Sequence, residues 1–262
     1  MPRDPAARPP LDRERLAQMG RGLAVEIVES APSTNALVAD RARDGAAHGL
    51  VVVAEHQTAG RGRLGRTWDT PARAALTFSV LLRPEVAATR WPWLPLLAGH
   101  AVATALREAE VPAGLKWPND VLIGHRKAAG ILLERVETPA GAAAVLGIGL
   151  NVTTTRGELP VDTATSVLVA TGTAPERTTL LVATLGCLVD EYDAWVAGRD
   201  EELRSAYSSA CVTIGREVRV DLPGGEVLHG RAQGIDEGGR LLVDGTAVGA
   251  GDVVHVRPAP EH

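Results

Sequence analysis

The sequence predicts an α+β protein made of a large main domain and a small all-β domain. Up to about residue 211, apolar β-rich runs are interspersed with segments whose apolar residues recur at helical spacing. From Val212 onward the chain has only short strand-like runs between glycine turns, which is typical of a small barrel. We therefore expect a flexible N-terminal arm (1–22), a main domain (23–211) and a C-terminal domain (212–262).

Charge and composition exclude some classes of function. A formal net charge of −5 without runs of Lys or Arg argues against a nucleic-acid-binding surface. Apolar stretches stay below the roughly 18 residues that a membrane span needs, and the first 21 residues lack the apolar core of a signal peptide. We therefore expect a cytoplasmic protein that binds neither nucleic acid nor membrane. The sequence leaves monomer and homodimer both open.

The first elements are a strand, a capped helix and a second strand. The strand over 23–28 is followed by Ser33 and Thr34, either of which fits a helix N-cap, and Gly45 fits the end of that helix. The apolar run 50–54 predicts the next strand. A helix that begins with small polar side chains is a natural place to hydrogen-bond a neutral polar ligand.

A loop rich in glycine and arginine, residues 55–68, comes directly after the strand 50–54. Gly60, Gly62 and Gly65 spell G-x-G-x-x-G, but the next run, 76–82, predicts a strand where a dinucleotide-binding motif requires a helix. The three arginines of the loop could pair with carboxylate or phosphate. We therefore interpret the stretch as an anion-handling loop.

The rest of the main domain predicts two core helices and a glycine-floored sheet. Apolar spacing predicts helices over 93–110 and 178–195, with shorter ones near 166–170 and 200–207. A hairpin (115–123 with 127–136) and a strand (143–152) lie between the long helices. Gly147 and Gly149 share one face of their strand, and Gly130 lies on a neighbouring strand, so something must approach the sheet closely there. In the C-terminal domain we expect strands over 217–220, 227–232, 241–243 and 253–256.

The sequence contains very few lysines, which makes the two positions that carry one candidate functional sites. Lys and Arg together number 27, and only Lys116 and Lys127 are lysines. Because the compact ammonium of lysine and the planar fork of arginine are not interchangeable, we interpret both lysines as retained for their chemistry.

These residues together resemble those of the bacterial biotin–protein ligases, over residues 23–257. The resemblance is carried by five segments in the family's order and spacing: 33–35, 55–68, 116–120, 127–132 and 147–151. It implies a mixed sheet backed by helices, of the class II aminoacyl-tRNA synthetase and biotin synthetase type, followed by a small SH3-like β-barrel. It also implies a two-step reaction. Biotin and MgATP give biotinyl-5′-AMP and pyrophosphate, and a lysine of a biotin carboxyl carrier domain of an acyl-CoA carboxylase then takes the biotinyl group.

The same resemblance implies roles for individual residues. Lys127, Arg61 and Arg63 are the expected catalytic residues. The residues expected to bind biotin are Ser33, Thr34, Asn35, Gln57, Gly60, Arg61, Lys127, Gly130, Gly147 and Gly149. Those expected to bind ATP or the adenylate are Arg61, Gly62, Arg63, Gly65, Trp68, Lys116, Asn119, Asp120, Lys127 and Asn151. The ligands of Mg²⁺ are not identified.

One departure and two alternatives accompany this interpretation. Many relatives begin with a DNA-binding helix-turn-helix, for which the residues before the first strand leave no room, so we expect a ligase without repressor function. A lipoate or octanoate ligase of the same fold is an alternative, although the polar set Ser33, Thr34 and Gln57 favours biotin. A non-catalytic biotin or nucleotide sensor is the other, although retention of the lysines and loop arginines argues against it.

Overall fold

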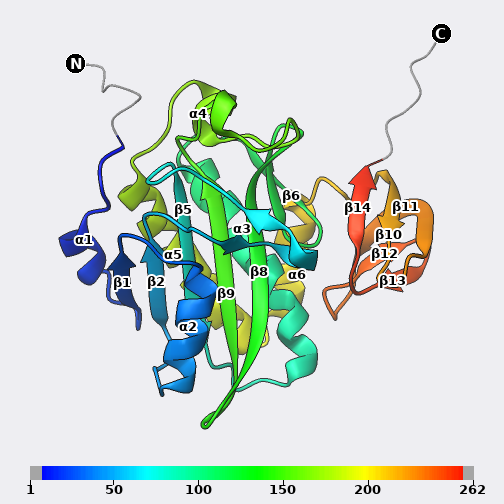
Figure 1. Ribbon diagram of the computed structural model, residues 1–262. Coiled ribbons are helices and arrows are strands. Elements are labelled where there is room, and N and C mark those ends of the chain that lie inside the picture. Colours follow the sequence, from blue (N-terminus) through cyan, green and yellow to red (C-terminus); the bar gives the residue numbers. More distant parts are fainter. Residues whose placement is uncertain (1–7, 256–262) are drawn as a thin grey trace.

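A computed structural model describes residues 8–255 of the protein. Its main part is a seven-stranded mixed sheet with helices on both faces, and a smaller antiparallel sheet follows at the C-terminal side (Figure 1). The predicted α+β class and mixed sheet are therefore confirmed.

The large sheet has one parallel pair, β1 with β2, and its other neighbouring strands are antiparallel. Its strand order is β1-β2-β5-β9-β8-β7-β6. The strands, in that order, are Ala24–Val28, Leu50–Ala54, Ala75–Leu82, Gly141–Asn151, Arg126–Thr138, Asp120–Ile123 and Ala113–Lys116.

Helix α2 (Thr34–Arg43) covers one face of this sheet, and α3 (Leu94–Glu108), α5 (Arg177–Val196) and α6 (Asp200–Ala210) lie on the other (Figure 1). The face under α2 is packed by a small apolar cluster that includes Val38 and Val52. The main core lies on the opposite face, where α3 buries residues such as Leu97 and Val102. Two further short helices are α1 (Arg13–Ala17) and α4 (Val167–Thr171). Among the helices of residues 8–255, none is both long enough and apolar enough to cross a membrane.

The glycine loop joins strand to strand, as predicted. It folds back on itself through β3 (Gly60–Arg61) and β4 (Thr67–Trp68), with one 3-10 turn over Arg63–Gly65 between them. Gly65 and Leu64 both have positive φ, and Leu64 at the loop tip is 70% exposed. Residues 60–68 contain no α-helix. The three glycines therefore cannot open the helix on which a dinucleotide-binding motif depends.

The C-terminal domain is a five-stranded antiparallel sheet in the order β13-β12-β11-β10-β14. In chain order its strands are Glu217–Asp221, Val227–Ile235, Leu241–Val243, Thr246–Val248 and Asp252–His255. The sequence missed β13, whose three residues are too short to give a periodic signal.

Two other expectations differ from the structure. The run 115–123 forms two strands, β6 and β7, because Pro118 lies between them and has no N–H to donate to a sheet. The sequence predicts a disordered or loosely docked arm with a short helix over 11–19; α1 confirms the helix, but Leu11 and Leu16, 5% and 1% exposed, pack firmly into the main core. Residues 1–7 of the arm, and residue 256 of the last expected strand, lie outside the described residues.

Candidate active site

Two adjoining cavities lie where α2, the glycine loop and strands β7, β8 and β9 meet. The small cavity, of about 50 Å³, extends to the N-terminus of α2, and the large cavity, of about 640 Å³, extends to the segment 160–164 and to Asp252. Both are lined by Gly62, Arg63, Trp68, Asn119 and Lys127. These five shared residues mark the place where the contents of the two cavities would meet.

Most of the predicted site residues line one or both cavities. Gly60 and Lys116 line neither: Gly60 is buried within the loop itself, and Lys116 ends the edge strand β6. The small cavity has Ser33, Thr34, Asn35, Gln57, Arg61, Arg63, Lys127, Gly130, Gly147 and Gly149 among its lining residues. The large cavity has Gly62, Arg63, Gly65, Trp68, Asn119, Asp120, Lys127 and Asn151.

The polar end of the small cavity is a hydrogen-bonded network at the start of α2. Oε1 of Gln57 accepts hydrogen bonds from the backbone N–H of Thr34 (2.8 Å) and from its hydroxyl (3.1 Å). Gln57 thus caps the helix, whereas the N-cap residue Ser33 makes no side-chain capping bond. The hydroxyl of Ser79, on β5, lies 2.7 Å from Thr34 Oγ1 and 2.6 Å from Asn35 Oδ1. The side chains are therefore held in fixed positions around the cavity.

The network continues to the loop through Glu134. Asn35 donates from Nδ2 to a carboxylate oxygen of Glu134 (2.6 Å), and Arg61 donates to the same oxygen (3.3 Å). The first arginine of the loop is thereby connected to the helix that forms the polar end of the cavity.

The sequence missed Ser79 and Glu134. Ser79 is fully buried in β5, a mostly apolar strand in which Thr77 is the other hydroxyl residue, and buried hydroxyls in such a run are the available signal. Glu134 is a charged residue in the β8 run, but its partners lie 73 and 99 residues away, beyond the reach of local pattern.

The three sheet glycines lie where other groups approach the backbone closely, as predicted. A Cβ on Gly147 would lie 2.2 Å from Oδ1 of Asn35, and one on Gly149 would lie 2.5 Å from the indole of Trp68. A Cβ on Gly130 would lie 3.1 Å from Nζ of Lys127. Each glycine therefore makes room for a different residue of the site.

Lys127 is fixed by its side chain and by its backbone. Its Nζ lies 2.6 Å from Oδ1 of Asp120 on the neighbouring strand β7. Its N–H donates to Thr163 O (2.9 Å) and its carbonyl accepts from Thr165 N (2.8 Å). The β7–β8 register shifts between Val121 and Leu122, next to the lysine. Such irregularities re-aim side chains beside functional sites.

Arg63 and Arg66 connect the loop to its surroundings. Arg63 donates to Oδ1 of Asn119 (2.8 Å), and desolvation lowers the pKa of its half-buried guanidinium. Arg66 pairs with Asp252 of the C-terminal domain. The loop therefore makes contacts with both domains.

Two buried polar atoms at the large cavity have no partner within residues 8–255. They are Nε1 of Trp68 and Oδ1 of Asn151, whose Nδ2 donates to Thr165 O (3.0 Å). Buried polar groups are normally hydrogen-bonded, so this donor and this acceptor fit a bound ligand.

The carboxylates that line the large cavity determine whether a metal ion could bind there. In the part of the chain that the structure describes, no cluster of three or more His, Cys, Asp or Glu side chains could hold a metal by itself. Asp69, Asp120 and Asp252 line the large cavity singly. Mg²⁺ commonly binds one or two carboxylates together with substrate phosphates, and such an arrangement fits these residues.

Comparison with known families agrees with this geometry. The model of the biotin/lipoate A/B protein ligase family matches residues 27–151, and that of the biotin protein ligase C-terminal domain matches residues 213–256. The chain is 43% identical to the biotin--[acetyl-CoA-carboxylase] ligase of Mycobacterium tuberculosis over 95% of this chain and 97% of that protein. It is 33% identical to the bifunctional ligase/repressor BirA of Bacillus subtilis over 81% of this chain and 66% of that protein.

A solved structure extends the agreement to three dimensions. The biotin protein ligase of Aquifex aeolicus, in complex with biotin and ATP, superposes with a TM-score of 0.77. The two are 29% identical, and the match covers 89% of this chain and 99% of the Aquifex chain.

Proposed function

The chain belongs to the biotin protein ligase family, and on that premise we propose that it joins biotin to a lysine of a carrier domain in two ATP-dependent steps. In the first, biotin and ATP give biotinyl-5′-AMP and pyrophosphate. In the second, the lysine amine takes the biotinyl group and AMP leaves. The observation that carries the proposal is the meeting of the two cavities at Lys127 and Arg63.

The small cavity is the proposed biotin site. The ureido head of biotin has N–H donors and a carbonyl acceptor, which match the polar side chains of Ser33, Thr34 and Gln57. Asn35 lines the cavity beside them, and Gly60 leaves room for Gln57, because a Cβ on it would lie 2.9 Å from Nε2 of that side chain. The apolar part of biotin would lie along Gly130, Gly147 and Gly149, with its carboxylate toward Lys127.

The large cavity is the proposed nucleotide site. Trp68 and Asn151 each offer a buried polar atom that is unpartnered within the described chain, and Trp68 also offers an aromatic face to the adenine. Asn119, Asp120 and the loop residues Gly62, Arg63 and Gly65 line the same space. Mg²⁺, bound through the ATP phosphates and a carboxylate such as Asp120, would neutralise phosphate charge. Lys116 lines neither cavity, so its positive charge would act on the nucleotide phosphates only at long range.

The positive charges explain how two anions can react. Attack of the biotin carboxylate oxygen on the α-phosphorus forms the mixed anhydride and breaks the bond to pyrophosphate, and charge repulsion opposes the approach. Lys127, Arg61 and Arg63 would offset that repulsion, each preorganised donor being worth about 3 kcal/mol. In the second step the acceptor amine attacks the acyl carbon and loses a proton, and AMP departs. Closure of the glycine loop would keep water from the anhydride.

The wider biological assignments follow from the same premise. The acceptor is the biotin carboxyl carrier domain of an acyl-CoA carboxylase, and the reaction takes place in the cytoplasm. We assign catalysis to residues 23–211 and a supporting role to residues 212–262.

Biotin-dependent exchange of labelled pyrophosphate into ATP tests the first step. We expect exchange with biotin and none with lipoate or octanoate, because an aliphatic acid leaves the polar groups at α2 unpaired. Exchange with lipoate or octanoate instead would favour the lipoate ligase alternative. Absence of exchange with all three acids would favour a sensor.

A further inference from the structure

A buried ion pair outside both cavities connects the N-terminal arm to the main domain. Glu55 follows β2, and Arg177 begins α5. Nη1 of Arg177 lies 2.7 Å from Oε2 of Glu55, and the side chains of Glu55 and Arg177 are 2% and 6% exposed. Neither residue lines the small cavity or the large cavity of the candidate site. A buried pair gives little net stability after desolvation, so stability alone does not account for it.

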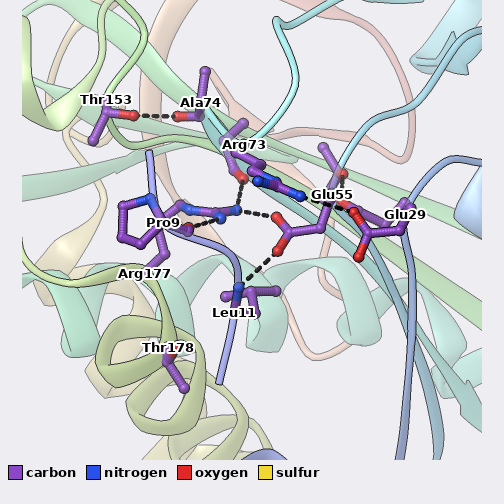
Figure 2. Close-up of polar contacts among 12 residues, drawn as sticks. Pro9, Leu11, Glu29, Glu55, Arg73, Ala74, Thr153, Arg177 and Thr178 are labelled. Carbon is purple, nitrogen blue, oxygen red and sulfur yellow. Dashed lines mark hydrogen bonds and ion pairs between the residues drawn. The ribbon is translucent and has the colours of Figure 1, made fainter. Parts of the chain in front are cut away.

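The pair holds residues 8–12, here called the strap, through Pro9 and Leu11 (Figure 2). The second carboxylate oxygen of Glu55 accepts the N–H of Leu11 (2.6 Å). Arg177 donates to the carbonyl of Pro9 (2.7 Å) and to that of Ala75, the first residue of β5 (3.3 Å). The carboxylate of Glu55 and the guanidinium of Arg177 thus connect the backbone of the strap to the backbone of β5.

At its other end the strap reaches the segment that leads to the large cavity. Arg8 donates to the carbonyl of Thr153 (3.1 Å) and pairs with Glu158 (2.5 Å). The Arg8 guanidinium and hydrogen bonds from Thr155 lower the pKa of Glu158 to about 2, so the pair stays charged at neutral pH. Five residues beyond Glu158, Thr163 lines the large cavity and bonds the backbone of Lys127.

Glu55 also lies two residues before Gln57. Its own N–H donates to Val28 O (3.0 Å) and its carbonyl accepts from Arg73 N (2.7 Å), so its side chain and backbone fix the start of the glycine loop. The small cavity depends on Gln57 at the start of that loop.

We propose that Glu55, Arg177 and Arg8 are positioning residues, through which the strap holds Gln57 on the biotin side and the segment 153–165 on the nucleotide side. The substrates assigned to the two sides rest on the proposed function. The strap itself contacts neither substrate and acts through the residues it holds.

Arg8→Met tests the nucleotide side in the full chain. The change strands no buried charge, because Glu158 is partly exposed. We expect the KM for ATP to rise about 2- to 30-fold while the KM for biotin stays within twofold, since remote positioning changes are worth that much. Arg15→Met is the matched control: it removes another arm arginine, whose partners Thr179 and Glu176 lie at the start of α5. Equal KM values for ATP in Arg8→Met and wild type would overturn this half of the proposal.

The ion pair itself needs a variant that separates positioning from stability. Glu55→Gln leaves Arg177 buried without its counter-charge and is expected to unfold easily. The double variant Glu55→Gln with Arg177→Met removes both charges and is expected to fold. We expect its KM for biotin to be raised about 2- to 30-fold despite a wild-type circular dichroism spectrum. Wild-type KM values in the folded double variant would overturn the role of the pair.

Hydrogen exchange separates failure of this proposal from failure of the proposed function. Amides of residues 153–165 should exchange faster in Arg8→Met than in wild type and Arg15→Met, without any substrate present. Unchanged exchange would contradict the strap even in an active enzyme. Faster exchange in a chain with no biotin-dependent activity would support the strap and contradict the function.

Discussion

Lys127 Nζ and Asp120 Oδ1 form a 2.6 Å ion pair between neighbouring strands, at the place where the two cavities join. The carboxylate keeps the ammonium oriented across the sheet. On the proposed function, an incoming carboxylate and phosphate would interact with the same positive charge. Strands β7 and β8 therefore position this ammonium.

Replacing Lys127 with Ala should abolish adenylate formation and spare biotin binding. Removal of a preorganised donor to developing charge costs about 10²- to 10³-fold in rate, whereas the ureido contacts at α2 remain. Pyrophosphate exchange measures the first effect, and calorimetric titration with biotin measures the second. The exposed neighbour Arg126→Ala is the control, with near wild-type exchange expected. Normal adenylate synthesis by Lys127→Ala would show that the assignment is wrong.

Replacing Arg63 with Gly should let the adenylate escape. The arginine holds the loop to Asn119 (2.8 Å) and lines both cavities, so its loss opens the place where the anhydride would lie. We expect faster release of radiolabelled adenylate and acylation of unrelated amines. Arg63→Lys keeps the charge without the bidentate fork and should leak to an intermediate extent. Retention equal to wild type in Arg63→Gly would mean that the loop is not a lid.

Replacing Gly149 with Ala should displace Trp68. The new Cβ would lie 2.5 Å from the indole, so the ring or the strand must shift, at a cost of about 1–3 kcal/mol. We expect a weaker apparent affinity for ATP and a lower melting temperature. Gly234→Ala is a matched control, because Gly234 also lies in a strand and an added Cβ there would meet nothing within 4 Å. Equal ATP affinity in Gly149→Ala and wild type would argue against Trp68 as a nucleotide contact.

The C-terminal domain should lose stability in mild acid through His255. Burial, and next the nearby charge of Lys116, lower the pKa of His255 to about 4 from an ordinary value of 6.5. Between these two values the unfolded chain binds a proton that the folded chain does not, so the free energy of unfolding falls as pH drops from about 6.5 to about 4. Urea denaturation followed at several pH values measures this slope, which should be shallower in His255→Gln. Identical slopes in the two proteins would contradict this account of His255.

The glycines and the loop illustrate what could be predicted from the sequence. Gly147 and Gly149 alternate along a strand, and local periodicity was enough to predict that something approaches that face. The identity of what approaches, Asn35 and Trp68, depends on how distant segments pack. The same local reasoning placed the loop between two strands, because an apolar run follows it without helical spacing.

The buried ion pair illustrates what could not be predicted. Glu55 and Arg177 are separated by 122 residues, and each alone is an ordinary charged side chain in a polar stretch. Only the folded sheet brings them together and excludes water from both. The firm docking of the arm, of which the sequence indicates only a loose form, has the same cause, since Leu11 and Leu16 are buried in the main apolar core together with residues distant in the sequence.

The most direct test of the central claim is the mass of a carrier domain after incubation with this protein, biotin and MgATP. The account predicts a mass increase of one biotinyl group on the acceptor lysine, dependent on both ATP and biotin and lost in Lys127→Ala. An unchanged carrier mass with the wild-type protein, or modification by lipoate or octanoate in place of biotin, would contradict it.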